Sequence, residues 1–447
     1  MDILRGDPKK AINMLAIPMI LSMLITTANN LADSIWVAGL GANPLAAIGF
    51  ITPLFFILIG IGNGIGAGVN SVIARYIGAK NDYKATNSGL HSIILSIGIS
   101  LIVTVILLLS CKTLLEIMGV NDVLQYALSY GNILFAGSFT LICSNIFSSI
   151  FRAEGDIKRA TNPLILTAIL NIILDPIFIY VLNMGIAGAA IATVLSTLLA
   201  VILQVYWMFI KRDMFLKLDF KLYKRDLSIY KDILIVGIPA SLEQLLMAML
   251  GFINNSLIAA TGGSMQVAAY TSAWRLISIG NMPSIGIGTA LITVAGVAYG
   301  SRNLDNLKKA YTYSIKIGTF ISVILVIFFY ITAGYLANVF TYSSNNPQLL
   351  DFIVNCLHIL VWFLVPLSIG ISASSILQAL GKGIFSLLLI IIRKILVVLL
   401  FVLLFVFVFH WKSEGVYLGI VVGNMVGSVI AYLIIEIYLK RLKKYFV

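Results

Sequence analysis

The feature that most constrains this chain is a series of apolar stretches, each long enough to cross a lipid bilayer as a helix. The hydrocarbon core of a bilayer is about 30 Å thick, so a spanning helix needs roughly 20 predominantly apolar residues. The stretches at 92–110 and 395–409 lack the polar–apolar alternation of a transmembrane β-strand. Charged residues make up 11% of the chain, compared with about 25% in soluble domains. The sequence therefore predicts an all-α integral membrane protein.

The apolar stretches fall into two groups of six, giving twelve expected spans. The first group lies near 11–36, 45–74, 88–110, 123–151, 161–182 and 186–210. The second group lies near 233–258, 266–299, 311–335, 351–380, 384–409 and 415–439. The Lys- and Arg-rich stretch between them is expected to lie as an amphipathic linker on the membrane surface. We therefore predict an N-terminal six-helix lobe at 1–210, a cytoplasmic linker at 211–232 and a C-terminal six-helix lobe at 233–447.

The basic residues predict the orientation of the chain in the membrane. Of the 30 Lys and Arg residues, only Lys112 and Lys412 fall in loops that are expected outside. Because cytoplasmic loops carry an excess of Lys and Arg, both termini are predicted to be cytoplasmic, in a multi-pass protein of the cell membrane. This asymmetry accounts for the net charge of +12, so no nucleic-acid partner is expected. The three cysteines and three histidines are scattered and form no metal-binding motif.

The two groups of spans are related by an internal repeat. The segment 41–47 recurs at 263–269, and glycines further along each copy keep the same offset. Each group has an even number of spans, so the copies share one orientation and are related by a pseudo-two-fold axis normal to the membrane. A parallel repeat of this kind suggests a central cleft. Gly60, Gly64 and Gly68 have the spacing that lets helix backbones approach closely.

Three acidic residues fall inside expected spans: Asp33, Asp175 and Glu243. A charge at this depth costs several kcal/mol on insertion scales, so each acid is a candidate for function. Two interpretations of Glu243 stay open: a structural ion pair with Arg275, which is slightly favoured because buried charges are usually paired, and contact with a cationic substrate.

Polar residues accompany the two acids of the first lobe. Asn29 and Asn30 lie one helical turn before Asp33 and Thr26 lies two turns before it, and Asn171 lies one turn before Asp175. Pro176 lacks an amide hydrogen, so it should free the carbonyl of the residue four positions earlier and kink the helix. A carboxylate, an amide and a free carbonyl at one level suit a small cation or a shared proton.

Further polar side chains on the fourth and sixth spans could face these acids if the first lobe closes as one bundle. They include Asn145, Ser148, Thr193 and Thr197. The competing interpretation is that they only join helices through hydrogen bonds of about 0.6 kcal/mol each.

Four segments together resemble the multidrug and toxic compound extrusion (MATE) family, most closely its DinF-like prokaryotic branch. They are Asn-Asn-Leu-Ala-Asp at 29–33, Phe-Arg-Ala-Glu-Gly-Asp at 151–156, Asn-Ile-Ile-Leu-Asp-Pro at 171–176 and Gly-Ile-Ala-Gly-Ala-Ala at 185–190. The resemblance implies two six-helix lobes arranged as a V. It also implies a secondary active antiporter, not an enzyme, which exports cationic, amphipathic organic compounds in exchange for protons or sodium ions.

The resemblance also implies site residues. Cation coupling would involve Asp33, Asn145, Asn171, Asp175 and Thr193. A sodium ion would be held by Asp33, Asn171, Asp175 and Thr193, and no other cofactor is expected. The substrate pocket would include Thr26, Asn30, Tyr130, Ser148 and Thr197. The expected partners are small organic cations and the lipid bilayer, and the protein is expected to be monomeric.

Two alternatives to export would each need residues of a different kind. A flippase of lipid-linked oligosaccharide precursors, from the same superfamily, would need several arginines to meet pyrophosphate, and Arg275 and Arg393 are the only candidates. An integral-membrane prenyl-transfer enzyme would need aspartate-rich Mg²⁺ motifs, which the sequence lacks.

Overall fold

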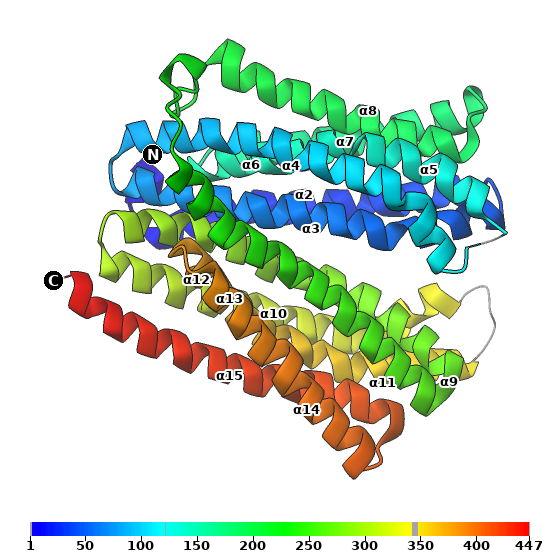
Figure 1. The fold of residues 1–447 in the computed structure, drawn as a ribbon. Helices are drawn as coiled ribbons and strands as arrows, with labels where there is room; N and C mark the ends of the chain where they lie inside the picture. The colour runs from blue at the N-terminus through cyan, green and yellow to red at the C-terminus, as the bar shows by residue number, and fades with distance from the viewer. Residues whose placement is uncertain (1, 121, 342–346, 447) are drawn as a thin grey trace. The chain divides into compact units, whose positions relative to one another are not determined.

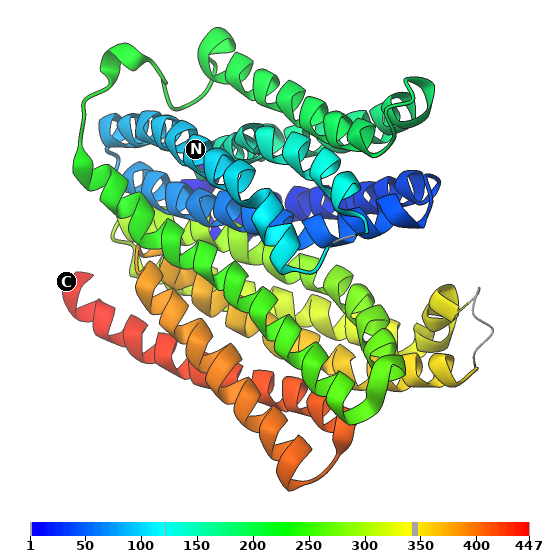
Figure 2. The same ribbon diagram turned by 45° about the vertical axis from the view of Figure 1, so that its right-hand side comes forward.

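The computed structural model describes residues 2–120, 122–341 and 347–446, and over these residues all regular secondary structure is helical (Figures 1 and 2). The chain divides into two compact units. The first unit consists mainly of Ile17–Leu242, and the second consists of Ile3–Ala16 with Glu243–Val447. The predicted lobe and linker boundaries are not tested by this division and stay a prediction.

The first unit is built from long helices joined by short turns (Figure 1). In chain order its elements are α2 (Pro8–Ala38), α3 (Ala42–Gly78), α4 (Asp82–Ile117), α5 (Leu124–Ala136), α6 (Ser138–Ala153), α7 (Ile157–Pro176), η1 (Ile177–Val181), α8 (Gly185–Val205), η2 (Tyr206–Lys211) and η3 (Phe220–Leu222). The short helix α1 (Asp2–Arg5) precedes them. The start of α2, through Ala16, belongs to the second unit, where the side chains of Asn13 and Tyr313 are hydrogen-bonded at 2.7 Å.

The second unit continues the same pattern of helices. Its elements are α9 (Leu227–Gly300) from Glu243 onward, α10 (Leu304–Thr341), α11 (Pro347–Leu360), η4 (Val361–Phe363), α12 (Leu364–Ala379), α13 (Gly383–Ile390), η5 (Ile391–Val397), α14 (Val398–Leu403), η6 (Leu404–Val408) and α15 (Lys412–Phe446). The segments η1, η2, η5 and η6 are π-helical, which makes them wider than the α-helices they extend.

The number of spans agrees with the sequence over the described residues. Ten helices are long and apolar enough to cross a membrane, and α5 with α6, bent by 44°, forms an eleventh span. Helix α9 has 74 residues and is broken at Gly263, where φ is 76°. This left-handed conformation suits glycine, which has no Cβ. Because 74 residues of helix would extend about 110 Å, α9 supplies two spans, and the total is twelve.

Glycines allow close packing inside the first unit. A Cβ at Gly64 would collide with the backbone of Ser241, and a Cβ at Gly68 would collide with the carbonyl of Ile233. Helix α3 therefore touches the first part of α9 backbone to backbone. The close approach predicted from the glycine spacing is confirmed at Gly64 and Gly68.

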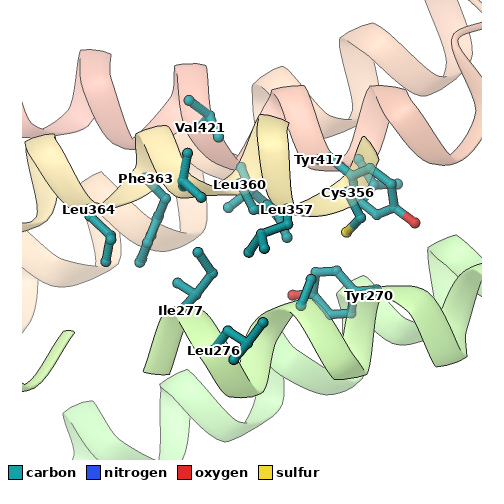
Figure 3. Close-up of a cluster of buried hydrophobic side chains, with 14 of the residues drawn as sticks. Tyr270, Leu276, Ile277, Cys356, Leu357, Leu360, Phe363, Leu364, Tyr417 and Val421 are labelled. Atoms are coloured by element: carbon teal, nitrogen blue, oxygen red, sulfur yellow. The ribbon is translucent and has the colours of Figure 1, made fainter. Parts of the chain in front are cut away.

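The second unit has an apolar core in which side chains of α9, α11, α12 and α15 meet (Figure 3). Tyr270 of α9 and Tyr417 of α15 stack with ring centroids 5.9 Å apart. The buried hydroxyl of Tyr417 donates to Oε1 of Gln266 at 2.9 Å. The polar group of this tyrosine is therefore hydrogen-bonded although its ring lies in the apolar core.

The segment between the two groups of spans is folded onto the first unit. Leu216 and Leu218 are buried. The side chain of Asn87 on α4 donates to the carbonyl of Lys224 at 2.8 Å and accepts from its amide at 3.2 Å. The amide of Asp226 donates to Nε2 of the fully buried His91 at 3.0 Å. The linker is therefore an integral part of the first unit.

Candidate functional site

Helices α2, α7 and α8 bring together most of the residues predicted to couple a cation. Residues four positions apart lie on one face of a helix, so Asn29 and Asp33 of α2 point together, as do Asn171 and Asp175 of α7. Thr193 on α8 faces the same place. Asn171 and Asp175 are fully buried.

Hydrogen bonds connect these side chains and so link α2, α7 and α8. Nδ2 of Asn29 donates to Oδ1 of Asn171 at 2.8 Å. Nδ2 of Asn171 donates to Oδ1 of Asp175 at 3.1 Å and approaches the hydroxyl of Thr193 at 3.5 Å. That hydroxyl donates to the carbonyl of Ala189 at 3.1 Å. Asn171 is thus the centre of the network, with contacts to all three helices.

The two carboxyl groups of the network lie beside each other. Asp33 and Asp175 are close enough to interact through a hydrogen bond between their side chains and through their charges. Two adjacent carboxylates repel each other, so such a pair holds one proton or one cation far more readily than two isolated acids.

Several oxygens of this network have no donor. Oδ1 of Asp33, Oδ2 of Asp175 and Oδ1 of Asn29 are buried and have no hydrogen-bond partner among the residues described. A buried polar atom without a partner costs roughly 1–3 kcal/mol, and more when it is charged. Hard cations prefer oxygen ligands of this kind. The predicted sodium ligands Asp33 and Asp175 therefore fit a small cation, and a proton on either carboxyl would also relieve the cost.

The helix changes its geometry directly after the site. Pro176 ends α7, and the next turn is the π-helical segment η1, closed by a hydrogen bond from the amide of Leu182 to the carbonyl of Ile177 at 2.9 Å. The hydroxyl of Tyr180 in η1 donates to the carbonyl of Trp36 on α2 at 2.5 Å. The wider turn after the proline thus fixes the end of α2, one turn beyond Asp33.

Two further candidates, Tyr130 and Asn145, differ in whether they reach the acids. The hydroxyl of Tyr130 lies near enough to Asp33 and Asp175 to interact with both charges. Asn145 donates to the carbonyl of Leu141 within its own helix at 3.0 Å, and its amide is not hydrogen-bonded to the acid pair in the described structure.

The remaining predicted substrate residues do not reach the network through hydrogen bonds. Thr26 is exposed and donates to the carbonyl of Ser22 at 2.9 Å, and Asn30 is also exposed. Thr197 is buried and donates to the carbonyl of Thr193 at 2.8 Å. Ser148 accepts a hydrogen bond from Gln204 at 2.9 Å. Whether these residues bind substrate stays a prediction.

Two residues at or near the site were not assigned a coupling or substrate role from the sequence. Asn29 bridges α2 and α7, and its place one turn before Asp33 is the signal for it in the sequence. Gln204 is fully buried at the end of α8 and joins Ser148 and the carbonyl of Ser144. An amide inside an otherwise apolar span is the signal that would have found it.

The structure does not support the ion pair between Glu243 and Arg275. Oε1 of Glu243 accepts from the hydroxyl of Ser386 at 2.8 Å, and Oε2 accepts from Gln378 at 3.1 Å. Arg275 is exposed. No ion pair joins the two residues within the described part of the chain. The carboxylate of Glu243 is instead hydrogen-bonded by neutral donors of α12 and α13.

A protein-family model matches both halves of the chain. The MatE family model matches residues 18–177 and 239–410, which together exceed half of the chain. The same model therefore matches once in each half, as the internal repeat would lead one to expect. This family is the one that the four sequence motifs resemble.

Two relatives named for multidrug export or resistance are similar to this chain over most of their own length. The chain is 25% identical over 393 residues to the multidrug export protein MepA of Staphylococcus aureus (strain MRSA252), which covers 87% of this chain and 85% of MepA. It is 27% identical over 347 residues to the probable multidrug resistance protein YoeA of Bacillus subtilis (strain 168), covering 74% and 73% of the two chains.

Solved structures are similar over the whole chain. A crystal structure of MATE in complex with MaL6 is 40% identical and superimposes with a TM-score of 0.96 over 99% of both chains. An outward-facing conformation of a multidrug resistance MATE family transporter of the MOP superfamily is 40% identical, with a TM-score of 0.95 over 99% of this chain and 98% of that one. The predicted all-α membrane fold is thus confirmed.

Proposed function

Because this chain belongs to the multidrug and toxic compound extrusion family, we propose that it is a multidrug exporter of the cell membrane, in which the Asp33–Asp175 network exchanges a proton or a sodium ion for a cationic, amphipathic substrate. The similarity to proteins named for multidrug export supports this proposal. The excess of Lys and Arg in the expected inner loops supports cytoplasmic termini. We propose that the protein acts as a monomer, because Asn29, Asn171, Asp175 and Thr193 complete the acid network from helices of one unit.

One observation carries the coupling part of the proposal. Two carboxyl groups lie beside each other, and each has a buried oxygen without a donor. In the described part of the chain no basic side chain forms an ion pair with Asp33 or Asp175. The pair is therefore free to take up and release a cation.

The proposed exchange follows from electrostatics. A proton or sodium ion entering from outside neutralises one carboxylate and removes the repulsion between Asp33 and Asp175. Asn29 then holds α2 to α7, so a change at the acids is transmitted to α2. The membrane potential contributes about 2.3 kcal/mol per charge per 100 mV to this step. Loss of the ion on the cytoplasmic side restores the paired negative charge, which attracts a cationic substrate.

The test uses protein reconstituted in proteoliposomes with a fluorescent organic cation. A proton gradient without sodium should drive dye transport if protons are coupled, and a sodium gradient at equal pH should drive it if sodium is coupled. Asp33→Asn should abolish transport by either gradient while the protein remains folded. Transport by Asp33→Asn at the wild-type rate, or wild-type transport that ignores both gradients, would refute the proposal.

The proposal favours export over lipid-linked oligosaccharide flipping. A flippase would need several buried arginines for a pyrophosphate, whereas Arg275 is exposed. Arg393 is the one buried arginine among those two candidates.

A further inference from the structure

The linker, the green segment that leads from α8 into α9 (Figure 2), has two different sides. Met214, Leu216 and Leu218 are buried against the first unit. Phe215 and Lys217, which alternate with them in the chain, are exposed. One side of the linker is therefore used for packing within the protein, and the other side carries an aromatic ring and a cation outward.

The outward side stays rich in large apolar side chains through η3 and beyond it. Phe220, Leu222 and Leu227 are 51%, 47% and 64% exposed. Basic side chains that are also exposed are interspersed among them; these are Lys221, Lys224 and Arg225. Exposed apolar groups mixed with Lys and Arg are typical of a segment that lies in the interfacial region of a membrane.

Contacts with two spanning helices place this segment at the height of the membrane surface. The rings of Phe220 and Phe209 stack with centroids 5.5 Å apart and planes at 9°. Phe209 lies two residues before the end of the span Gly185–Lys211. The ammonium of Lys224 lies 6.0 Å from the centroid of Tyr83, at the start of α4. The linker therefore crosses the ends of two spans, where lipid headgroups lie.

The positive charge of the linker is not cancelled within the first unit. Residues 211–226 carry six basic and three acidic side chains, a net charge of +3. Asp213 pairs with Arg159 at 2.7 Å and with Lys211 at 3.2 Å. In the part of the chain that the structure describes, the other basic side chains of this segment form no ion pair; they are Arg212, Lys217, Lys221, Lys224 and Arg225.

We propose that the outward side of the linker is a binding surface for acidic phospholipids of the cytoplasmic leaflet. This linker surface consists of Lys217, Phe220, Lys221, Leu222, Lys224 and Arg225. The basic groups meet the lipid phosphates, and the apolar side chains enter the boundary between headgroups and acyl chains. A soluble anion would use the charges but would leave Phe220 and Leu222 uncovered. This inference goes beyond export, because it involves neither the acid pair nor a transported compound.

The test measures which lipid lies next to the linker. Leu222→Cys can be labelled selectively with an environment-sensitive fluorophore, since Cys111, Cys143 and Cys356 are buried. The labelled protein is placed in phosphatidylcholine nanodiscs that contain a small fraction of either phosphatidylglycerol or phosphatidylcholine with a nitroxide near the top of the acyl chain. The nitroxide on phosphatidylglycerol should quench the fluorophore more strongly, and added sodium chloride should reduce the difference.

Loss of the basic groups should remove the preference for the acidic lipid. Lys221→Gln combined with Arg225→Gln should lower the preference by at least about fivefold, which corresponds to roughly 1 kcal/mol for one basic residue near an anionic leaflet. Arg302→Gln combined with Lys309→Gln is the matched control. It removes one Arg and one Lys from exposed positions around the start of α10 and should leave the preference unchanged.

Three outcomes would overturn the proposal. They are equal quenching by the two lipids, an equal loss of preference in the control variant, and displacement of phosphatidylglycerol by inorganic phosphate beyond the effect of sodium chloride at the same ionic strength. The last outcome would indicate a site for a soluble anion. Because no transport is measured, a failure of the proposed ion exchange would leave the lipid preference intact.

Discussion

Asn29 donates its amide hydrogen to Asn171 across 2.8 Å, which joins α2 to α7 beside the two acids Asp33 and Asp175. The bond connects residues that are 142 positions apart in the chain. Asn171 passes the contact on to Asp175. Helix α2 is therefore linked through Asn171 to Asp175, whose side chain is fully buried.

Replacing Asn29 should weaken the contact between α2 and α7. In Asn29→Ala, Oδ1 of the buried Asn171 loses its donor, and we expect a cost of about 1–3 kcal/mol in stability together with slower ion-driven transport. Thermal unfolding in detergent and dye transport in proteoliposomes measure the two effects. Asn30→Ala, at the next and exposed position of the same helix, should leave the unfolding temperature unchanged. An unfolding temperature of Asn29→Ala equal to wild type would contradict this role.

The contact between α3 and α9 should not tolerate a side chain. In Gly68→Val the new side chain meets the carbonyl of Ile233 and the backbone of Gly237, so overpacking of at least about 1–3 kcal/mol is expected. The yield of monodisperse protein in size-exclusion chromatography should fall. Gly98→Ala on α4 is the matched control, since a Cβ there meets no atom within 4 Å. A normal yield of Gly68→Val would show that the helices can separate.

A pH dependence is expected at the loop between α6 and α7. Burial raises the pKa of Glu154 from its usual 4.5 to about 8, and the charge of Asp156 adds to the shift, while the amide of Leu216 and Arg159 oppose it. The folded protein then binds the proton more tightly than the unfolded chain. The resulting stability is fully present below about pH 4.5 and is lost as the pH rises toward 8.

The variant Glu154→Gln should remove this dependence. A neutral amide can still accept the hydrogen bond from the amide of Leu216, which Glu154 accepts at 3.1 Å. We expect the unfolding temperature of the variant to exceed that of wild type increasingly between pH 5 and pH 8. Parallel curves for the two proteins over this range would mean that Glu154 stays charged when folded.

The docked linker should loosen when its anchor on α4 is removed. In Asn87→Ala the carbonyl and amide of Lys224 lose their partners, at a cost of about 1–3 kcal/mol to the docked state. Hydrogen–deuterium exchange of residues 216–226 should become faster, while exchange in the core of α4 stays slow. Lys158→Ala, an exposed position on α7, serves as the control. Unchanged exchange in the linker would show that buried Leu216 and Leu218 suffice to hold it.

Much of the site could be predicted because charges in a bilayer are costly and helices repeat every 3.6 residues. Asp33 and Asp175 stand out in apolar stretches, and Asn171 precedes Asp175 by one turn. The two acids lie beside each other in the structure, and their coupling to an ion stays a prediction. Thr193 was placed by resemblance to the family, and it lies beside Asn171.

Contacts between distant helices could not be predicted in the same way. The partners of Glu243 lie 135 and 143 residues away, and which of them it meets depends on the rotation of three helices about their axes. The π-helical segment that contains the buried Arg393 and Lys394 could not be predicted from the spacing of apolar residues. A residue's helix can therefore be read from one sequence, whereas its cross-helix partner needs tertiary packing.

The docked linker bears on how this duplicated protein can be divided. Splitting the gene after residue 210 would remove Leu216 and Leu218, which are buried in the intact protein. It would also uncover His91, whose ring centroid lies 4.8 Å from that of Tyr223 and 4.6 Å from that of Tyr230. An N-terminal fragment made this way would expose apolar surface to water and aggregate. A fragment that keeps residues through Leu242 would carry its own cover, which makes it the better starting point for studying the acid pair in isolation.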